Sequence, residues 1–361
     1  MRITFVVPSI RCGGAERILT AMANYWAANG RTVTILTFDS ESVTPFYPLS
    51  PEVRLQSLDV LSEASNFVAG FRNNLQRIWA LRGALQATCP DVIISFLIRT
   101  NVRVLLASLG FNTPIIISER SDPFLSQPGK LWQGLARITY PFASKITVFT
   151  AHAAKYFPAS LRNKIRVIPN PVLALDKSAK LQAEGYRIVA VGRLEHVKGF
   201  DLLLKSFALV QQIFPTASLT IWGEGSQRRA LEALRDELSL SAHVSFPGVT
   251  KDVVQALTEA DLFVQTSRWE GFGNALCEAM SVGLPVISTC CSGPQEIIRD
   301  GVDGVLVPVE NVDALADAIL NLLPDFSKRQ SLAANALEIT KRFALRNIMR
   351  QWEQLLTEIT D

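Results

Sequence analysis

The chain of 361 residues, 48% of them hydrophobic and 19% charged, has the length of two ordinary domains and the composition of a compact soluble protein. It contains no run of eighteen uninterrupted apolar residues, so we expect no membrane-spanning helix. The net charge is +3, and no basic run is interleaved with aromatic residues, which makes a nucleic-acid-binding protein a poor fit.

Apolar, strand-like runs alternate with helical stretches in the first half of the chain. Their continuous apolar character is typical of parallel strands that are covered on both faces. Alternation of this kind predicts βαβ units and an α/β fold. The expected strands are Ile3–Val7, Thr32–Phe38, Val92–Phe96, Ile115–Ser118 and Ile146–Phe149.

The second half repeats this alternation after a proline-containing junction. Pro169 and Pro171 fix the chain direction there, and we interpret the polar segment that follows, up to Gly185, as a linker that provides slack. We therefore predict two doubly wound domains, 1–170 and 171–342, with a ligand cleft between the carboxyl edges of their sheets. The expected strands of the second domain are Ile188–Val191, Ser218–Trp222, Val244–Phe246, Leu262–Gln265 and Val286–Ser288.

A glycine pair follows the first expected strand, within Ser9–Arg17. Gly13 and Gly14 open a helix at this point, which leaves backbone amides unencumbered near a phosphate. Because any tight strand-to-helix turn can use such a pair, it carries weight only together with other motifs.

Two cations follow the strand that ends at Val191. Since the strand stops at Gly192, Arg193 and Lys198 stand at the carboxyl edge of a sheet, where ligands of open α/β domains bind. A guanidinium and an ammonium aimed at one point can neutralise a diphosphate and stabilise it as it leaves. The alternative is a pair of surface cations beside a helix start.

Two glutamates bracket a glycine loop after the strand Leu262–Gln265. Gly271 and Gly273 let the backbone approach a ligand, and the helix that follows points its free amides at an anion. Glu270 and Glu278 can accept hydrogen bonds from the hydroxyls of a sugar and a ribose. The alternative is that one carboxylate caps the loop and the other lies on a solvated helix face.

Together these segments resemble the family 4 retaining glycosyltransferases (group 1 glycosyl transferases) over essentially the whole chain. The resemblance rests on Gly-Gly-Ala-Glu at 13–16, on Ile168–Val172, on the Gly-Arg and Lys-Gly pairs at 192–199 and on the two spaced glutamates. It implies the GT-B fold, in which two Rossmann-like domains face each other across a cleft. The first would bind the acceptor and the second a nucleotide-sugar, and a final helix at about 343–361 would pack back on the first.

The resemblance also implies roles for single residues. Arg193 and Lys198 would bind the donor diphosphate, Glu270 would contact the transferred sugar, and Glu278 would hold the ribose. Backbone near Val249 would recognise the base. The remaining donor-binding positions are Gly13, Gly14, Gly192, Phe272, Gly273, Asn274, Ala275 and Leu276.

The implied reaction is same-face attack, in which the departing phosphate oxygen takes the proton of the acceptor. With Arg193 and Lys198 present, no divalent metal is required, and the sequence contains no Asp-x-Asp triplet that would hold one. No cofactor is expected, because the UDP- or GDP-sugar donor is itself a substrate.

One position departs from the family pattern. Where many members carry a histidine near the donor sugar, this chain reads Ser-Glu-Arg-Ser-Asp at 118–122. Glu119 or Arg120 is a candidate for contacting sugar or acceptor in its place, and we count Glu119 among the predicted catalytic residues. Asp122 is equally well explained as a turn residue before Pro123.

The charge is unevenly distributed between the halves. Residues 1–170 carry 18 Lys and Arg against 9 Asp and Glu, whereas the remainder carries 18 against 24. A basic half favours an anionic membrane face or a lipid phosphate as partner. The stretches 67–85 and 130–145 have the pattern of helices flanking a sheet, which is the favoured interpretation, and also that of basic amphipathic helices on a membrane.

The expected location is the cytoplasm, with peripheral contact to the inner face of the plasma membrane. The N-terminus lacks the basic-then-apolar pattern of a signal peptide. The five cysteines lack metal-ligand spacing, which indicates a reduced setting and no metal site.

The predicted function is transfer of a sugar from a nucleoside-diphosphate sugar to a glycan or polyprenyl-diphosphate-linked acceptor during surface polysaccharide, lipopolysaccharide or glycoconjugate biosynthesis. A sugar-nucleotide isomerase of the 2-epimerase type shares the same architecture and is the first alternative. A non-catalytic sugar-nucleotide sensor is the second.

Overall fold

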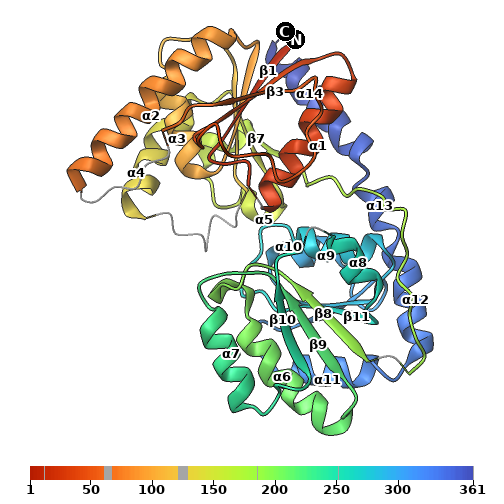
Figure 1. Cartoon of the computed structure of the whole chain (residues 1–361). Coiled ribbons are helices and arrows are strands. Elements are labelled where there is room, and N and C mark those ends of the chain that lie inside the picture. The colour runs from red at the N-terminus through yellow and green to blue at the C-terminus, as the bar shows by residue number, and fades with distance from the viewer. Residues whose placement is uncertain (12, 61–66, 121–128, 185, 251, 361) are drawn as a thin grey trace. The chain divides into compact units, whose positions relative to one another are not determined.

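A computed structural model describes residues 1–11, 13–60, 67–120, 129–184, 186–250 and 252–360. The chain divides into an N-terminal unit, residues 1–169 with 348–361, and a C-terminal unit, residues 170–347. Each unit is a parallel sheet with helices on both of its faces (Figure 1). The predicted α/β class, with two doubly wound sheets, is confirmed.

The N-terminal unit contains a seven-stranded sheet in the order β3-β2-β1-β4-β5-β6-β7. Figure 1 shows α2, α3 and α4 on one side of this sheet and α1 and α14 on the other. Its strands are β1 Arg2–Val7, β2 Thr32–Thr37, β3 Arg54–Ser57, β4 Val92–Phe96, β5 Ile115–Ser118, β6 Lys145–Val148 and β7 Ile165–Val167. Its helices are α1 Gly14–Ala28, α2 Phe67–Thr88, α3 Ile98–Ala107, α4 Lys130–Thr139, η1 Tyr140–Phe142, α5 Ala151–Ala154, η2 Ala159–Lys164 and α14 Leu345–Thr360.

The C-terminal unit contains a six-stranded sheet in the order β10-β9-β8-β11-β12-β13. Its strands are β8 Arg187–Val191, β9 Ser218–Trp222, β10 Val244–Gly248, β11 Leu262–Gln265, β12 Val286–Thr289 and β13 Val305–Val307. Its helices are η3 His196–Lys198, α6 Phe200–Ile213, α7 Arg228–Glu237, α8 Val253–Thr258, α9 Asn274–Ser281, α10 Ser292–Ile297, α11 Val312–Leu322, α12 Phe326–Ala336 and α13 Ile339–Arg342.

Burial of apolar side chains explains why the central strands form. All residues of β4, β5, β11 and β12 are buried, as expected for strands with helices on both faces. The final helix contributes to the N-terminal core, where Trp352 packs edge-on against Trp26 at a centroid distance of 6.2 Å. Glu353 of the same helix accepts a hydrogen bond of 2.6 Å from the indole of Trp26.

Three strands were not expected from the sequence: β3, β7 and β13. Each lies at an edge of its sheet and has three or four residues. Three of the four residues of β3 are polar, and Arg166 interrupts β7, so no apolar run marks these two strands. β13 is apolar but only three residues long. The predicted stretch 130–145 is also divided, because Pro141 interrupts it and α4 gives way to η1 and then β6.

The expectation of slack in the segment after Pro171 is wrong. Its backbone is hydrogen-bonded along the C-terminal unit: Ala179 N donates to Val282 O at 2.7 Å, and Lys180 N donates to Thr258 O at 3.1 Å. Gln182 N donates to the buried carboxylate of Asp261 at 2.9 Å. These hydrogen bonds fix the segment to the C-terminal unit. Their donors are backbone amides, which every residue except proline has, so the polar side chains of the segment give no sign of them.

Candidate active site

The order of the strands reverses at the middle of the C-terminal sheet. β8 pairs with β9 on one side and with β11 on the other. In open α/β sheets, ligands bind at such a reversal, outside the carboxyl ends of the strands. The loop after β8 carries Arg193 and Lys198, and the loop after β11 carries Glu270, so the predicted residues lie at this edge.

Lys198 and Glu270 meet directly. The ammonium of Lys198 forms an ion pair with Glu270 Oε2, and the hydroxyl of Ser267 donates to the same oxygen at 3.3 Å. Their side chains are 20% and 18% exposed, so both remain partly accessible. Two motifs that are 72 residues apart in the sequence therefore form one polar cluster.

Backbone contacts between the two loops hold this cluster in place. Gly199 has φ +64°, and a Cβ atom added there would lie 2.1 Å from the carbonyl oxygen of Thr266. The hydroxyl of Thr266 donates to Lys198 O at 2.9 Å, and Arg268 N donates to Val197 O at 2.8 Å. Glycine at 199 therefore permits the close approach that places Lys198 beside Glu270.

Arg268 connects the loop after β11 to the loop after β8 and to α6, a role that the sequence did not indicate. Its guanidinium donates to both carboxylate oxygens of Asp201, at 2.8 and 2.7 Å, and to Glu310 at 2.5 Å. It also donates to the carbonyl of His196 at 2.6 Å. The hydrogen bonds with Asp201 raise the pKa of Arg268 above its usual value. A single arginine outside any periodic pattern gives no signal of such a role.

The first turn of α9 presents backbone amides at the same edge. Gly273 caps the helix with φ +111°, a left-handed conformation that favours glycine. Asn274 accepts a hydrogen bond of 2.8 Å from the side chain of Asn170. Phe272 is buried and packs edge-on against Phe343. Ala275 and Leu276 complete this turn, and the half-buried Glu278 lies in the next.

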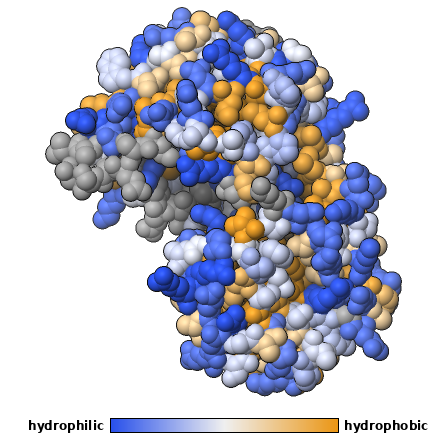
Figure 2. Space-filling view, in the orientation of Figure 1, coloured by the Kyte–Doolittle hydropathy of each residue, from blue (hydrophilic) through white to orange (hydrophobic). Residues whose placement is uncertain are grey.

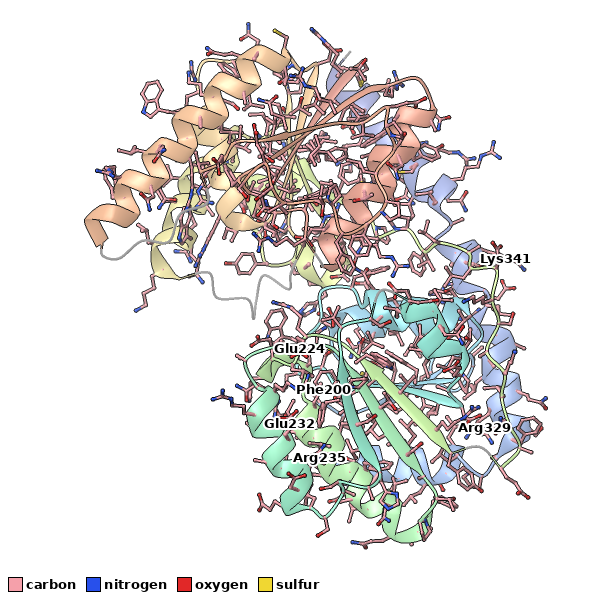
Figure 3. The ribbon with its side chains drawn as sticks, in the orientation of Figure 1. Phe200, Glu224, Glu232, Arg235, Arg329 and Lys341 are labelled. Atoms are coloured by element: carbon pink, nitrogen blue, oxygen red, sulfur yellow. The ribbon has the colours of Figure 1, made fainter. Side chains whose placement is uncertain are left out.

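Arg193 stands on the exposed side of the loop after β8. The loop is fixed by Gly192 N, which donates to Trp222 O at 2.9 Å, and by Leu194 N, which donates to Glu224 O at 2.9 Å. Figure 3 labels Glu224, in the loop after β9, and Phe200, the first residue of α6. Within the described residues, the Arg193 side chain has no hydrogen bond or ion pair, so its guanidinium is available to a ligand.

The remaining predicted positions lie apart from this cluster in the sequence. Val249, after β10, is 53% exposed. Gly13 and Gly14 lie at the start of α1 in the N-terminal unit, where the carboxylate of Glu16 lies against Gly13. The first turn of α1 thus already holds an anionic group of the chain itself.

Glu119 is buried inside the N-terminal unit, where its carboxylate is hydrogen-bonded. Its Oε1 accepts a hydrogen bond of 3.0 Å from Asn101 Nδ2 and another from the hydroxyl of Tyr140. Burial raises the pKa of Glu119 to about 7. The guanidinium of Arg120 lies over the rings of Phe96 and Phe149, at 4.3 and 4.8 Å from their centroids. Asp122 lies outside the described residues.

Replacing Glu119 by glutamine should stabilise the protein at alkaline pH. The pKa of Glu119 is higher in the folded chain than in the unfolded one, so the free energy of unfolding falls as pH rises from about 4.5 to 7 and stays low above that. The cost of holding the charge at about pH 8 is about 3 kcal/mol. Glu119→Gln keeps an acceptor for Tyr140, so its melting temperature should exceed the wild-type value at about pH 8 and approach it at about pH 5. An equal gain at both pH values would contradict this account.

The described residues contain few groups that are arranged for metal binding or thiol chemistry. Among the described residues, no cluster of three or more His, Cys, Asp or Glu side chains is arranged to hold a metal ion. The described cysteines are free, and burial raises the pKa of Cys291, which follows β12, to about 12. A search of the described residues also finds no helix with the length and apolarity to cross a membrane.

Comparisons with known proteins cover both units. Residues 13–171 match the glycosyl transferase 4-like domain, and residues 174–338 match the glycosyl transferases group 1. The chain is 30% identical over 364 residues, 99% of each protein, to GalNAc-α-(1→4)-GalNAc-α-(1→3)-diNAcBac-PP-undecaprenol α-1,4-N-acetyl-D-galactosaminyltransferase of Campylobacter jejuni. It is 33% identical, over 54% of this chain and 58% of the relative, to the lipopolysaccharide core biosynthesis glycosyltransferase LpsE of Rhizobium meliloti.

Solved structures show the same fold over the full length. Sucrose-phosphate synthase of Thermosynechococcus elongatus matches with a TM-score of 0.88 and 21% identity, over 99% of this chain and 98% of that one. HepE of Anabaena, solved with UDP and glucose, matches with a TM-score of 0.79 and 20% identity, over 98% and 99%. Fold, family profiles and the full-length relative agree with the sequence motifs. The chain belongs to the group 1 glycosyl transferases and is a family 4 glycosyltransferase of the GT-B fold.

Proposed function

We propose that the protein transfers a sugar, with retention of anomeric configuration and without a divalent metal, from a nucleoside-diphosphate sugar to a hydroxyl of a lipid-diphosphate-linked glycan. The observation that carries this proposal is the meeting of Lys198 with Glu270 at the strand reversal of the C-terminal sheet. A cation for the phosphates and a carboxylate for sugar hydroxyls then lie side by side.

The chemistry follows from where charge develops. The bond between C1 of the donor sugar and the diphosphate oxygen breaks, and the acceptor oxygen forms a new bond to C1 on the same face. The acceptor proton passes to the departing phosphate oxygen, so the products are a nucleoside diphosphate and a glycoside. Arg193, Lys198 and the amides at the start of α9 stabilise the growing negative charge. Glu270, already paired with Lys198, suits sugar positioning better than nucleophilic attack.

The names of similar proteins support the choice of substrates. The Campylobacter relative acts on an undecaprenyl-diphosphate-linked glycan, and the Anabaena structure was solved with UDP and glucose. We infer that this chain uses a UDP-sugar and a polyprenyl-diphosphate-linked acceptor. The relatives named above are transferases, and the comparisons give no support to the isomerase alternative.

A nucleotide-sugar panel tests the proposal. The true donor should raise the melting temperature by mass action and should transfer its sugar to a polyprenyl-diphosphate-linked glycan in the presence of a chelator. Proton NMR of the product should show the anomeric configuration of the donor. An inverted product would contradict retention, and abolition by the chelator would contradict metal independence. An epimerised donor without acceptor would favour an isomerase, and donor binding without any turnover would favour a sensor.

Replacing Glu278 by alanine should weaken UDP binding. Hydrogen bonds from a ribose to a carboxylate contribute roughly 1.5–3 kcal/mol, so the dissociation constant should rise roughly 10- to 100-fold. Isothermal calorimetry measures it directly. Glu237→Ala, at the exposed end of α7, is the matched control and should bind UDP as the wild type does. An unchanged constant in Glu278→Ala would remove the ribose assignment.

We also infer that the helical face formed by α2, α3 and α4 rests on an anionic membrane. α3 packs against both α2 and α4, and none of the three helices contains an acidic residue. Apolar side chains are exposed at helical spacing: Phe71 63%, Leu75 42% and Trp79 70% on α2, and Leu131 62%, Ile138 67% and Phe142 65% on α4 and η1. Figure 2 shows apolar atoms reaching the surface over α2. Exposed Arg72, Lys130 and Arg137 supply the cations that such a surface attracts.

Substituting glutamine for Trp79 and Ile138 together should reduce binding to vesicles that contain phosphatidylglycerol. Each side chain contributes on the order of 1.5 kcal/mol or more when it leaves water, so the partition coefficient should fall at least about tenfold. Sedimentation with vesicles measures it. Ile213→Gln, 63% exposed in the C-terminal unit, should leave binding unchanged. Equal binding by the double variant and the wild type would contradict the membrane assignment.

A further inference from the structure

The loop that joins β1 to α1 is anchored by a buried acid that lies two residues after the end of β2. Asp39 is fully buried, and its Oδ2 accepts a hydrogen bond of 3.0 Å from the backbone amide of Ile10. Thr37, the last residue of β2, donates its hydroxyl to Pro8 O at 3.4 Å and accepts from Asp39 N at 3.2 Å. The loop therefore leaves β1 in a fixed direction.

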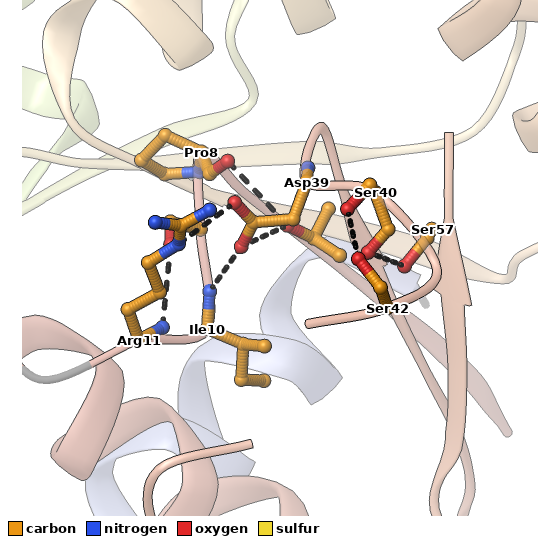
Figure 4. Close-up of polar contacts among 9 residues, drawn as sticks. Pro8, Ile10, Arg11, Asp39, Ser40, Ser42 and Ser57 are labelled. Carbon is orange, nitrogen blue, oxygen red and sulfur yellow. Dashed lines mark hydrogen bonds and ion pairs between the residues drawn. The ribbon is translucent and has the colours of Figure 1, made fainter. Parts of the chain in front are cut away.

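The second oxygen of this acid faces Arg11. Arg11 Nε lies 3.4 Å from Asp39 Oδ1, while the Arg11 side chain remains 64% exposed (Figure 4). Oδ1 is buried without any hydrogen bond from the described residues, so the guanidinium supplies the charge that balances it. Arg11 is thus held at one nitrogen, with most of its surface open to solvent.

Another buried acid in the chain is paired differently. Asp261 is also fully buried, and Arg187 donates to it through both Nε at 2.8 Å and Nη2 at 3.2 Å. That arrangement satisfies the carboxylate with two guanidinium nitrogens. Arg11 commits only Nε to Asp39, and within the described residues its two terminal nitrogens have no hydrogen-bond partner. Those are the nitrogens that bind a phosphate in the two-pronged geometry typical of arginine.

We propose that Arg11, oriented by Asp39, binds a phosphate group of a substrate. The inference rests on the proposed function, because both substrates of that reaction carry a diphosphate. Arg11 is the binding residue, and Asp39 is a positioning residue that acts through it. The phosphate belongs either to the nucleotide donor or to the lipid-diphosphate acceptor, and the same variants distinguish the two.

Three variants of the full-length chain separate phosphate binding from simple neutralisation of Asp39. Arg11→Ala removes the cation and leaves a buried charge, so both substrate affinity and melting temperature should fall. Arg11→Ala with Asp39→Asn removes the charge as well, which should restore much of the melting temperature but not the affinity. Asp39→Asn alone leaves Arg11 without its anchor and should give an intermediate loss of affinity. Arg2→Ala, which breaks the exposed pair with Asp91 at the other end of β1, is the control.

The measurements use UDP by calorimetry and two acceptors by initial rates. One acceptor is the polyprenyl-diphosphate-linked glycan, and the other is the octyl glycoside of the same glycan, which lacks phosphate. If Arg11 binds the acceptor, KM in the double variant should rise on the order of tenfold or more for the diphosphate-linked glycan only. If it binds the donor, the dissociation constant of UDP should rise by a similar factor, with both acceptors unaffected.

Wild-type values for UDP and for both acceptors in the double variant would overturn the proposal. Lys198→Ala, measured in parallel, keeps this failure distinct from that of the proposed function. Normal turnover in Lys198→Ala would refute the transferase chemistry itself, together with the inference that depends on it. Impaired turnover there, with wild-type constants in the double variant, would refute the assignment of Arg11 alone.

Discussion

Replacing Lys198 by alanine should lower kcat on the order of 100-fold or more, because it removes a fixed cation from the group that leaves with a developing negative charge. The effect should fall on kcat more than on the KM for the donor, since the charge on the leaving diphosphate is greatest in the transition state. The variant also leaves Glu270 without its ion-pair partner. Initial rates with the donor identified by the panel give both constants.

The control for this variant is Lys205→Ala. Lys205 is exposed on α6, seven residues beyond Lys198, and should be replaceable without effect on turnover. Lys198→Arg keeps the positive charge and should recover part of the rate. Near-normal kcat in Lys198→Ala would mean that the diphosphate is stabilised elsewhere, and the assignment of the site would fall.

Replacing Gly199 by alanine should destabilise the protein by roughly 2–4 kcal/mol. The residue has φ +64°, and its new Cβ atom would meet the backbone carbonyl of Thr266 at 2.1 Å. Strain of the left-handed conformation adds to the cost of moving one loop away from the other. Because that movement separates Lys198 from Glu270, activity should fall even in the fraction that remains folded. Urea denaturation followed by circular dichroism gives the change in the free energy of unfolding.

Gly301→Ala is the matched control for backbone strain. Gly301 has φ +71° in the same unit, but an added Cβ would have no atom within 4 Å. It should cost only about 1 kcal/mol and leave kcat unchanged. Equal losses of stability in the two variants would show that the cost at residue 199 comes only from its positive φ, and that the contact with the Thr266 carbonyl adds nothing to it.

Much of the fold could be predicted because apolar runs mark the central strands. The strands at 92–96, 115–118, 218–222 and 262–265 have the bounds that the sequence suggests. All residues of the first, second and fourth are buried, and buried residues alternate with half-buried ones in 218–222. The strands β3 and β7 could not be predicted, because polar residues interrupt both of them. β13 is apolar but has only three residues, too few to stand out as a strand. The path of the segment after Pro171 depends on backbone hydrogen bonds that side-chain polarity does not reveal.

The sequence predicts that some of the candidate site residues lie at the same sheet edge, and it gives no sign of others. Lys198 and Glu270 follow separate strands, and the pairing of β8 with β11 brings them together as expected of a parallel sheet. The connection formed by Arg268 was not predictable, because its partners come from three other segments. The burial of Glu119 could not be predicted either. The sequence shows a carboxylate after a strand, and it does not distinguish one that faces solvent from one that accepts a hydrogen bond from Tyr140.

The most direct test of the site is a crystal structure of the protein with bound UDP. We predict that Arg193 and Lys198 both lie within hydrogen-bonding distance of the diphosphate oxygens, with the ammonium of Lys198 shared between phosphate and Glu270. A complex in which UDP is bound while both side chains point away from the phosphorus atoms would contradict the account.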